Sequence, residues 1–480
     1  MQKTFLYGRY IVALILLGAG LLIPGCRTNP VTGEKQFLLV NPQQELAAGD
    51  RYHPNIILSH DGEYRGKELK RYLGTIVERL HECSHRPDTP IDFTVLNTSM
   101  VNAFAIPGHV YCTRGFLAEM ENEAQFAAVM GHELGHVTAM HSARQMTTDM
   151  LLGLGTAAAG SALADTEGGE AMLTAGLVGV KVIGLSYSRE QERQADRLGT
   201  YYMALAGWDP REAVAAQRIL HSDSGNSAGV FAPYLSTHPQ VADRLEQIRS
   251  VISNKRLLQR DLLQGNGVYE DRWERRLSRL RKVDKAFEPY DKGMELIGKG
   301  EYQKALDAAE RAISARSDQT PFFRLKGDAL FALERNKKAR EAYRHALELY
   351  PRYVLATMGL GEIALSTDNY EKAERHFETV VKSYPASLKG RWGLGRSRYK
   401  QGEYRAAVNP LRQVAQAAER DKPLPHYMLA VSYDRIGDLR GAWKQYKTAL
   451  SKGIRGEARR VARIRFRQLS ERFAQNAGES

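Results

Sequence analysis

The chain has 480 residues, more than one ordinary hydrophobic core accommodates, so two or three domains are expected. Hydrophobic residues make up 43% and charged residues 26%, which excludes a disordered chain and a protein with many membrane spans. The net charge of +13 favours anionic partners, such as acidic lipid headgroups or acidic proteins, or is simply a solvated basic surface. Arg and Lys form no compact cluster interleaved with aromatic residues, so a nucleic-acid partner is not expected.

The first 25 residues have the pattern of a signal peptide. Lys3 and Arg9 precede the apolar stretch "YIVALILLGAGLLI", which is marginal for a permanent membrane span. The following "LLIPGC" resembles the lipobox of bacterial lipoproteins, which implies lipidation of Cys26. The residue after it is Arg27 rather than Asp, which by the same resemblance favours the outer membrane and a periplasmic location. An uncleaved signal anchor and a secreted protein without lipid are the alternatives.

The next part of the chain alternates between helical and strand patterns. Residues 26–50 are expected to form a polar tether, a short strand and the start of a peptidase domain. Residues 63–82 place apolar side chains three and four positions apart, which predicts one face of a helix. The stretch "IDFTVLNTSMVNAFAIPGHVYCTRGFL" predicts two or three strands. Cys83 and Cys112 form an even pair that is compatible with a disulfide or with two separate thiols.

Helical spacing resumes between residues 121 and 146. From 150 to 187 small and apolar residues dominate, but three acidic residues divide the run into pieces too short to span a bilayer. We expect two buried helices around a charged loop, with a lid that dips into lipid as the alternative.

The C-terminal part repeats with a period of 34 residues. Gly293, Gly327, Gly361 and Gly395 follow this period, as do four alanines from Ala305 onward. Early Gly, central Ala and terminal Pro at this period are typical of tetratricopeptide repeats. About five repeats and a capping helix are expected in residues 286–475, after a helical linker at 256–285.

The stretch "MGHELGHVTAMHSARQM" contains the pattern HExxH. His132 and His136 lie one helical turn apart and can bind one zinc ion, with Glu133 as the general base for the attacking water. Two histidines on an amphipathic helix, satisfied by backbone or solvent, are the alternative. Ala139 and Ser142 exclude the longer metzincin pattern, and His141 is expected to turn away from the metal face of a continuous helix.

A third ligand is expected from "YSREQERQADRLG". Glu192 and Asp196 lie one turn apart on this predicted helix, whereas Glu190 faces another way. Glu192 can bind the zinc ion, and Asp196 can accept a hydrogen bond from a ligating imidazole. An ordinary charged surface helix is the alternative.

HELGH, the ExxxD of the second helix, "NAFAIPG" and "STHPQVADR" together resemble the M48 family of zinc metallopeptidases. The resemblance covers roughly residues 30 to 250. It implies the ligands His132, His136 and Glu192 for one Zn²⁺ per chain. It also implies Glu133 as the catalytic base and Asp196 as the supporting carboxylate. One motif departs from the family, which often has two glycines where this chain has Pro107-Gly108-His109.

The resemblance also concerns substrate and regulation. Substrate is expected to pair with the strand that contains Asn102, Ala103 and Phe104. His238 is either a plug in the open zinc position, as in similar proteins, or a loop histidine that caps the next helix. Arg244 is expected to contact the oxyanion or to orient the loop.

The expected fold is α+β and mainly helical: a zincin-type metallopeptidase domain of the gluzincin class at 51–255, followed by an all-α tetratricopeptide solenoid. The expected function is a zinc endopeptidase of the bacterial cell envelope, acting on misfolded or stalled outer-membrane proteins. The repeats would recruit unfolded clients or the outer-membrane assembly machinery. The alternative is a periplasmic chaperone or scaffold with latent protease activity, which Glu133→Gln distinguishes from an enzyme.

Overall fold

The computed structural model describes residues 26–162, 187–220, 231–238, 244–253, 266–417 and 422–478. Contacts between residues divide the chain into two compact units. The first unit contains the residues up to Ile56 together with Glu63–Asp284, and the second contains Ile57–Gly62 together with Lys285–Ser480. The buried apolar clusters of the two units share no residue, as is typical of separate domains.

The first unit contains a three-stranded sheet with the order β3 (Asp92–Leu96), β5 (His109–Thr113), β4 (Ala103–Ile106). The central strand β5 is parallel to β3 and antiparallel to β4, so β4 forms one edge of the sheet. Pro107 and Gly108 form the turn between β4 and β5, where Gly108 adopts a φ of 80° that favours glycine. The prediction of two or three strands in this range is confirmed.

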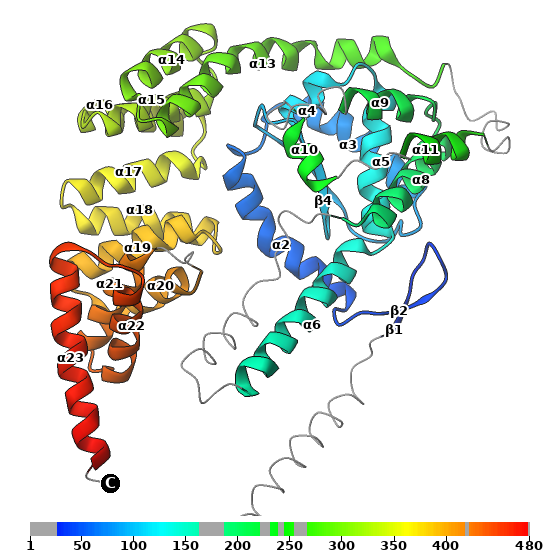
Figure 1. Cartoon of the computed structure of the whole chain (residues 1–480). Helices are drawn as coiled ribbons and strands as arrows, with labels where there is room; N and C mark the ends of the chain where they lie inside the picture. The colour runs from blue at the N-terminus through cyan, green and yellow to red at the C-terminus, as the bar shows by residue number, and fades with distance from the viewer. Residues whose placement is uncertain are drawn as a thin grey trace, which may run out of the picture. The chain divides into compact units, whose positions relative to one another are not determined.

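Helix α5 (Glu123–Thr138) lies at the centre of the first unit, and all of its residues are buried. It packs against α3 (Lys67–Glu82), α8 (Arg189–Leu205), α9 (Glu212–Leu220) and strand β4 (Figure 1). The Asn122 side chain accepts a backbone N–H of the first turn and so begins the helix. Because the HELGH motif lies on this helix, its polar side chains must find partners inside the protein.

The helical spacing between residues 121 and 146 belongs to two helices rather than to one continuous helix. α5 ends at Thr138, and α6 (His141–Ala162) begins three residues later. Met140, between them, has a φ of 57°, a left-handed conformation that interrupts helical geometry. The expectation that a continuous helix turns His141 away from the site is therefore wrong.

The N-terminal segment, expected to be a polar tether with one short strand, forms a β-hairpin of two short strands. β1 (Cys26–Thr28) pairs antiparallel with β2 (Lys35–Phe37), and α2 (Pro42–Ser59) follows. In the turn between the strands, the Asn29 amide donates a 3.2 Å hydrogen bond to the Ala139 carbonyl. The hairpin therefore contacts the end of the helix that carries the HELGH motif.

Two buried helices were expected between residues 150 and 187, and the described side chains at the start of this range differ from that expectation. α6 continues to Ala162, and its Leu151 and Leu152 side chains are 48% and 64% exposed. The expected second helix and charged loop lie outside the described residues. Among the helices that the structure describes, none is both long and apolar enough to cross a bilayer.

The thiols of Cys26, Cys83 and Cys112 are free. Cys83 is half-buried, and Cys112 is buried in the central strand β5. Burial raises the pKa of both of these thiols, which favours the unreactive protonated form. The two residues left open as a disulfide pair are thus separate thiols in this structure.

α13 (Glu270–Gly298) begins in the first unit and ends in the second. Its first turns contribute Trp273, Leu277 and Leu280 to the core of the first unit. The described residues of the expected linker, up to Asp284, are therefore part of the peptidase unit.

A buried carboxylate attaches α13 to α5. Glu123 accepts hydrogen bonds from the Tyr72 hydroxyl, from the Trp208 indole at 2.9 Å and from Arg272 at 2.7 Å. Glu123 is almost fully buried, whereas Arg272 is partly exposed. Three donors satisfy this charge, as a buried carboxylate requires.

The second unit consists of consecutive helices that pack in pairs (Figure 1). Four alanines at the 34-residue period, from Ala305 to Ala407, are fully buried where the helices of a pair meet. The predicted tetratricopeptide solenoid is confirmed. The helices that follow α13 are α14 (Tyr302–Ala315), α15 (Thr320–Ala332), α16 (Asn336–Leu349), α17 (Val354–Ser366), α18 (Tyr370–Ser383), α19 (Leu388–Gln401), α20 (Tyr404–Ala417), α21 (Pro423–Arg435), α22 (Leu439–Ser451) and α23 (Gly456–Gly478).

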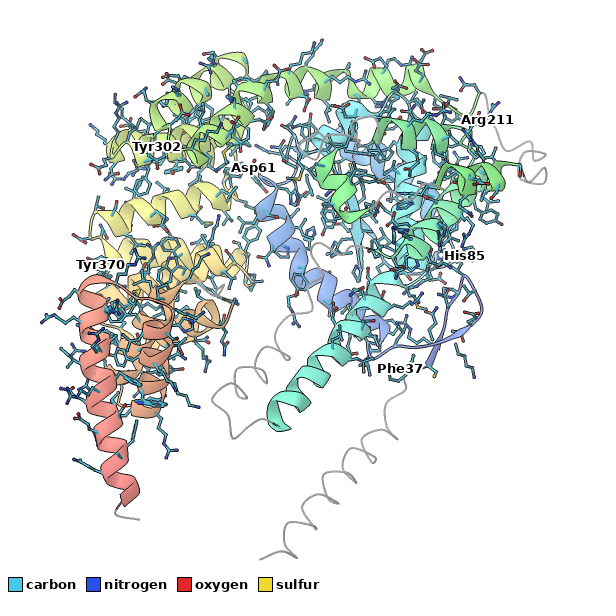
Figure 2. The ribbon with its side chains drawn as sticks, in the orientation of Figure 1. Phe37, Asp61, His85, Arg211, Tyr302 and Tyr370 are labelled. Carbon is cyan, nitrogen blue, oxygen red and sulfur yellow. The ribbon has the colours of Figure 1, made fainter. Side chains whose placement is uncertain are left out.

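Equivalent sequence positions recur at equivalent places in the repeats. Tyr302 and Tyr370, which Figure 2 labels, are the first residues of α14 and α18, each the second helix of its repeat. They lie two periods apart in the sequence. After the last pair, α23 buries Ala462 and Leu469 against α22, which makes it the expected capping helix.

Candidate metal centre

Two helices supply the predicted site residues of the first unit. α5 carries His132, Glu133 and His136, and α8 carries Glu192 and Asp196. Ser188 begins α8 with a capping box: its side chain accepts the backbone N–H three residues later, whose Gln side chain in turn accepts the Ser188 backbone N–H. This cap fixes the start of the helix one turn before Glu192, so that the carboxylate faces α5.

Three glycines allow α5 and α8 to approach each other closely. A Cβ atom on Gly199 of α8 would lie 2.5 Å from the backbone nitrogen of His132. On α5, a Cβ on Gly131 would meet the Gly199 carbonyl at 2.9 Å, and one on Gly135 would meet Ala195 at 3.0 Å. Gly135, the glycine of HELGH, therefore has a packing role, because its lack of a side chain lets α8 lie close to α5.

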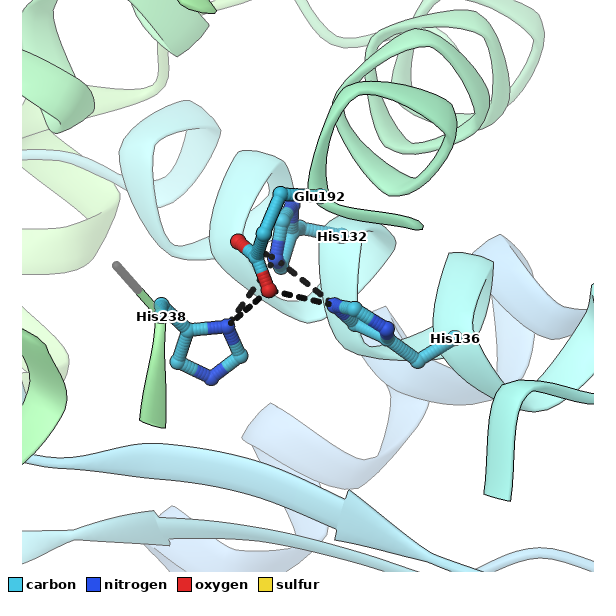
Figure 3. A group of neighbouring side chains, drawn as sticks. All are labelled: His132, His136, Glu192 and His238. Atoms are coloured by element: carbon cyan, nitrogen blue, oxygen red, sulfur yellow. Dashed lines mark hydrogen bonds and ion pairs between the residues drawn. The ribbon is translucent and has the colours of Figure 1, made fainter. Parts of the chain in front are cut away.

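The residues His132, His136, Glu192 and His238 form a buried cluster, here called the four-residue cluster (Figure 3). One candidate ligand atom from each lies within 4.8 Å of all the others. The Nε2 atoms of His132 and His136 are 3.1 Å apart, and the Glu192 carboxylate lies 3.5 Å and 3.4 Å from them. His238 Nδ1 is 3.1 Å from the same carboxylate.

Asp196 orients His132. The His132 Nδ1–H donates to Asp196 at 2.9 Å, which turns Nε2 of the ring toward the cluster. Arg244, the first residue of α11 (Arg244–Ile252), donates two hydrogen bonds to Asp196 at 2.7 and 2.8 Å. Burial raises the pKa of Asp196, but the Arg244 charge and the hydrogen bonds from Arg244 and His132 together outweigh burial and hold that pKa below its usual value. Arg244 also lies 3.2 Å from Glu192, so it contacts both carboxylates.

His141 orients His136, although the sequence predicted that it would face away. The Gln194 side-chain oxygen lies 3.0 Å from His141 Nε2 and accepts its proton, which leaves a lone pair on Nδ1. His136 Nδ1 lies 2.9 Å from that atom and donates to it, so Nε2 of His136 presents its own lone pair to the cluster. Burial lowers the pKa of His141 to about 4, which keeps this ring neutral.

Glu133 lies beside the cluster with no hydrogen bond to either of its carboxylate oxygens among the described residues. Across the site, the Nε2 atom of His238 lies 3.4 Å from a Glu133 carboxylate oxygen. Burial raises the pKa of Glu133, which makes the carboxylate a better proton acceptor. The geometry therefore suits a general base at the edge of a metal centre.

His238 follows α10 (Ala232–Thr237) and reaches the cluster from the side opposite α8 (Figure 3). Its ring stacks on Tyr234 with centroids 4.6 Å apart, and its backbone N–H donates to the Tyr234 carbonyl. Tyr187 stacks on His136 at 3.7 Å. Neither tyrosine, nor Gln194, was predicted from the sequence, because no local pattern distinguishes them from ordinary core residues.

The donor set fits a zinc-class cation. Two imidazoles and one carboxylate converge, and next to them lies a second carboxylate, that of Glu133, which no described residue hydrogen-bonds. Burial lowers the pKa of His132, but Asp196 and Glu192 outweigh burial and raise it to about 9. Burial lowers the pKa of the neighbouring His136 well below its usual value. The carboxylates of the site thus favour positive charge there, while burial favours the neutral form of His136. Both properties suit a site that binds a cation.

The predicted substrate strand lies next to this centre. β4 is packed against α5, and its outer side is not paired with another strand among the described residues. Ala103 is buried, and Phe104 is half-buried and stacks on Tyr111 with ring centroids 4.8 Å apart. Asn102 precedes the strand, and its side-chain oxygen accepts the Ala103 backbone N–H at 2.9 Å.

Comparisons with known proteins agree with this division of the chain. Residues 67–252 match the model of peptidase family M48, and residues 290–424 match the tetratricopeptide repeat in three overlapping copies. The β-barrel assembly-enhancing protease of Escherichia coli K12 is 31% identical over 232 residues, which are 46% of this chain and 47% of the relative. The protein of the same name from Yersinia pestis is 30% identical over 237 residues, 48% of each chain.

A third relative, metalloprotease YcaL of E. coli K12, is 29% identical over 204 residues, which are 42% of this chain and 74% of YcaL. The chain spans about half the length of the two β-barrel assembly-enhancing proteases that it matches. The HELGH helix, the ExxxD helix and the 34-residue period all fall inside the matched ranges. The chain thus combines a peptidase family M48 domain with tetratricopeptide repeats.

Proposed function

We propose that this protein is a zinc-dependent endopeptidase. The observation that carries the proposal is the four-residue cluster with Glu133 beside it, buried between α5 and α8. In this proposal His132, His136 and Glu192 hold one Zn²⁺ per chain, and Asp196 and Arg244 position these ligands. When bound, zinc would acidify a water molecule and polarise the scissile carbonyl.

The chain's own residues would then carry the proton. Glu133 would accept it from the attacking water and pass it to the leaving amine. Its raised pKa supports this role, as do its carboxylate oxygens, which accept no hydrogen bond from the residues that the structure describes. Asp196 and His141 would hold the two imidazoles with their Nε2 lone pairs directed inward, so that no reorganisation accompanies the reaction.

The substrate would bind as an added strand along β4, at Asn102, Ala103 and Phe104. Such pairing recognises backbone more than side chains, which suits unfolded proteins rather than one defined cleavage site. The position of β4 at the sheet edge and against α5 supports this. The clients would be misfolded or stalled proteins of the bacterial envelope; two relatives named β-barrel assembly-enhancing protease support a role in β-barrel assembly.

The repeats would recruit these clients or the outer-membrane assembly machinery through their concave face. A lipid on Cys26 would attach the protein to the outer membrane, on its periplasmic side. The signal-peptide pattern before Cys26 supports this location.

His238 would keep the resting enzyme latent by occupying the open ligand position. Its contacts with Glu192 at 3.1 Å and Glu133 at 3.4 Å support this role. The same contacts favour a second candidate function, a chaperone or scaffold whose protease acts rarely. His238→Ala should raise the rate of casein cleavage several-fold if the plug exists, and an unchanged rate would remove it from the proposal.

Glu133→Gln tests the enzyme itself. The variant keeps the size of the side chain and removes the base, so casein cleavage should fall by at least a hundredfold while zinc content stays at the wild-type level. Glu190→Gln, an exposed glutamate of α8 paired with arginines, is the matched control and should cleave casein normally. Cleavage by Glu133→Gln at the wild-type rate would sink the enzyme proposal. A loss of cleavage with preserved rescue of envelope-protein assembly in cells would favour the chaperone function.

A further inference from the structure

A second group of histidine and aspartate side chains lies in the first unit, away from the four-residue cluster. Asp92 and His109 are the first residues of β3 and β5, and the parallel register makes them direct partners. Asp50 and His53 lie three residues apart on α2, so both face the start of these strands. Four chemically suitable side chains from three segments therefore meet at one end of the sheet.

His109 has the hydrogen-bonding pattern of a metal ligand. Its side chain is 10% exposed. Its Nε2–H donates to the Asp50 carboxylate at 2.9 Å, which leaves the lone pair on Nδ1. That Nδ1 atom is buried without a hydrogen-bond partner in the described part of the chain, and an Asp92 carboxylate oxygen lies 4.0 Å away. A ligating imidazole commonly donates its second N–H to a carboxylate in this way.

His53 completes the group. Its ring stacks on that of His109, with centroids 4.4 Å apart and an angle of 16° between the planes. Its Nδ1 lies 2.7 Å from the buried Tyr111 hydroxyl, which fixes the orientation of the ring. Burial and the neighbouring His109 lower the pKa of His53.

We propose that His53, Asp92 and His109, here called the stacked-histidine cluster, bind a second divalent cation of the zinc class, with Asp50 orienting His109. One ligand atom from each residue lies within 4.8 Å of the others. Zinc–ligand distances of about 2.0–2.1 Å place tetrahedral donors about 3.4 Å apart. Asp92, whose side chain is 58% exposed, is free to close the remaining gap.

The position of α2 is fixed without the ion, so the three segments that carry the ligands are already next to one another. A Cβ on Gly49 would lie 1.8 Å from the Pro107 carbonyl, which means that α2 rests directly on the turn between β4 and β5. A cation held by the stacked-histidine cluster would connect α2 to β3 and β5, next to the strand proposed to bind substrate. Because no residue is shared with the four-residue cluster, this site would stabilise the domain and take no part in proton transfer.

Metal stoichiometry of the full-length, tag-free protein tests the proposal. After equilibrium dialysis against buffered Zn²⁺, elemental analysis should find two ions per wild-type chain and one in His109→Gln. Glu192→Gln should also retain one ion, and the double variant none. His345→Gln, which removes an exposed histidine of the second unit, is the control and should retain two ions.

One ion per wild-type chain, or two in His109→Gln, would overturn the proposal. Should His109→Gln fail to fold by circular dichroism, Asp92→Asn decides the question, because its exposed side chain can change without disturbing the core. Asp92→Asn should bind the second Zn²⁺ at least tenfold more weakly, and unchanged affinity would contradict the site. Casein cleavage, measured in parallel, separates this outcome from failure at the catalytic centre.

Discussion

Gly199→Ala should disable the metal centre without touching any of its side chains. The added Cβ would lie 2.5 Å from the His132 backbone nitrogen and 2.7 Å from the Gly131 carbonyl carbon. Non-bonded carbon contacts are optimal at about 3.5–4.0 Å, so α8 must retreat from α5 by roughly 1 Å. Both contacts are with backbone, which cannot move aside as a flexible side chain could.

The same shift acts on the ligands that α8 carries. A retreat of about 1 Å lengthens the 2.9 Å hydrogen bond from His132 to Asp196 beyond a bonding distance. Loss of a hydrogen bond to a charged group costs about 1.5–3 kcal/mol, which corresponds to roughly a ten- to hundredfold loss of zinc affinity. Misplacing the carboxylate of Glu192 by the same distance should lower the cleavage rate by about a hundredfold.

Gly74→Ala on α3 is the matched control, because a Cβ there meets nothing within 4 Å. It should leave zinc content and casein cleavage unchanged and stabilise the domain by about 0.5–1 kcal/mol. Both variants should be compared by circular dichroism, zinc analysis and casein cleavage. The packing argument would be refuted by a folded Gly199→Ala protein with wild-type zinc affinity and wild-type cleavage.

Two further predictions concern side chains that support the centre. Gln194→Ala should weaken zinc binding by about tenfold, because His141 loses the acceptor that fixes its own tautomer and thereby that of His136. Zinc competition titration measures the affinity, and an unchanged value would mean that the His141 contact has no role. Glu123→Ala should lower the free energy of unfolding by about 3–5 kcal/mol, since Trp208 and Tyr72 lose a buried acceptor. Urea unfolding followed by tryptophan fluorescence measures this, and a loss below about 1 kcal/mol would show that water replaces the carboxylate.

The repeats and the chemistry of the centre were predictable because their signals are periodic or spaced. The 34-residue period of Gly and Ala marks the close helix contacts of the solenoid, so the fold of the second unit follows from the sequence. HExxH and ExxxD each place polar residues on one face of a helix. Their assignment as zinc ligands remains a prediction, although the structure brings His132, His136 and Glu192 together.

The features that were missed depend on tertiary structure. Met140 separates α5 from α6 although it is neither Gly nor Pro, the residues that usually mark such a break. The position of His141 was therefore predicted wrongly, from the geometry of one continuous helix. The strands of the N-terminal hairpin have three residues each, too few for a periodic pattern. Leu151 was expected to be buried because its segment is rich in small and apolar residues. Composition does not show whether a neighbouring element covers a side chain.

The stacked-histidine cluster shows the same limit. His53, Asp92 and His109 come from a helix and two strands, and no two of them share a short motif. Only the parallel register of β3 and β5 places Asp92 beside His109. Such a site becomes visible when the chain is folded.

The central claim is that Glu192 completes the metal centre. Reactivation of the metal-free protein by zinc measures this directly, because casein cleavage reports the catalytic ion alone. Replacing a supporting residue of a zinc site costs about 10- to 100-fold in affinity, so Glu192→Gln, which removes a ligand, should need at least a hundredfold more free zinc or fail to recover. Glu190→Gln, two residues away and exposed, should recover at the wild-type zinc concentration. Recovery of Glu192→Gln at that same concentration would contradict the assignment.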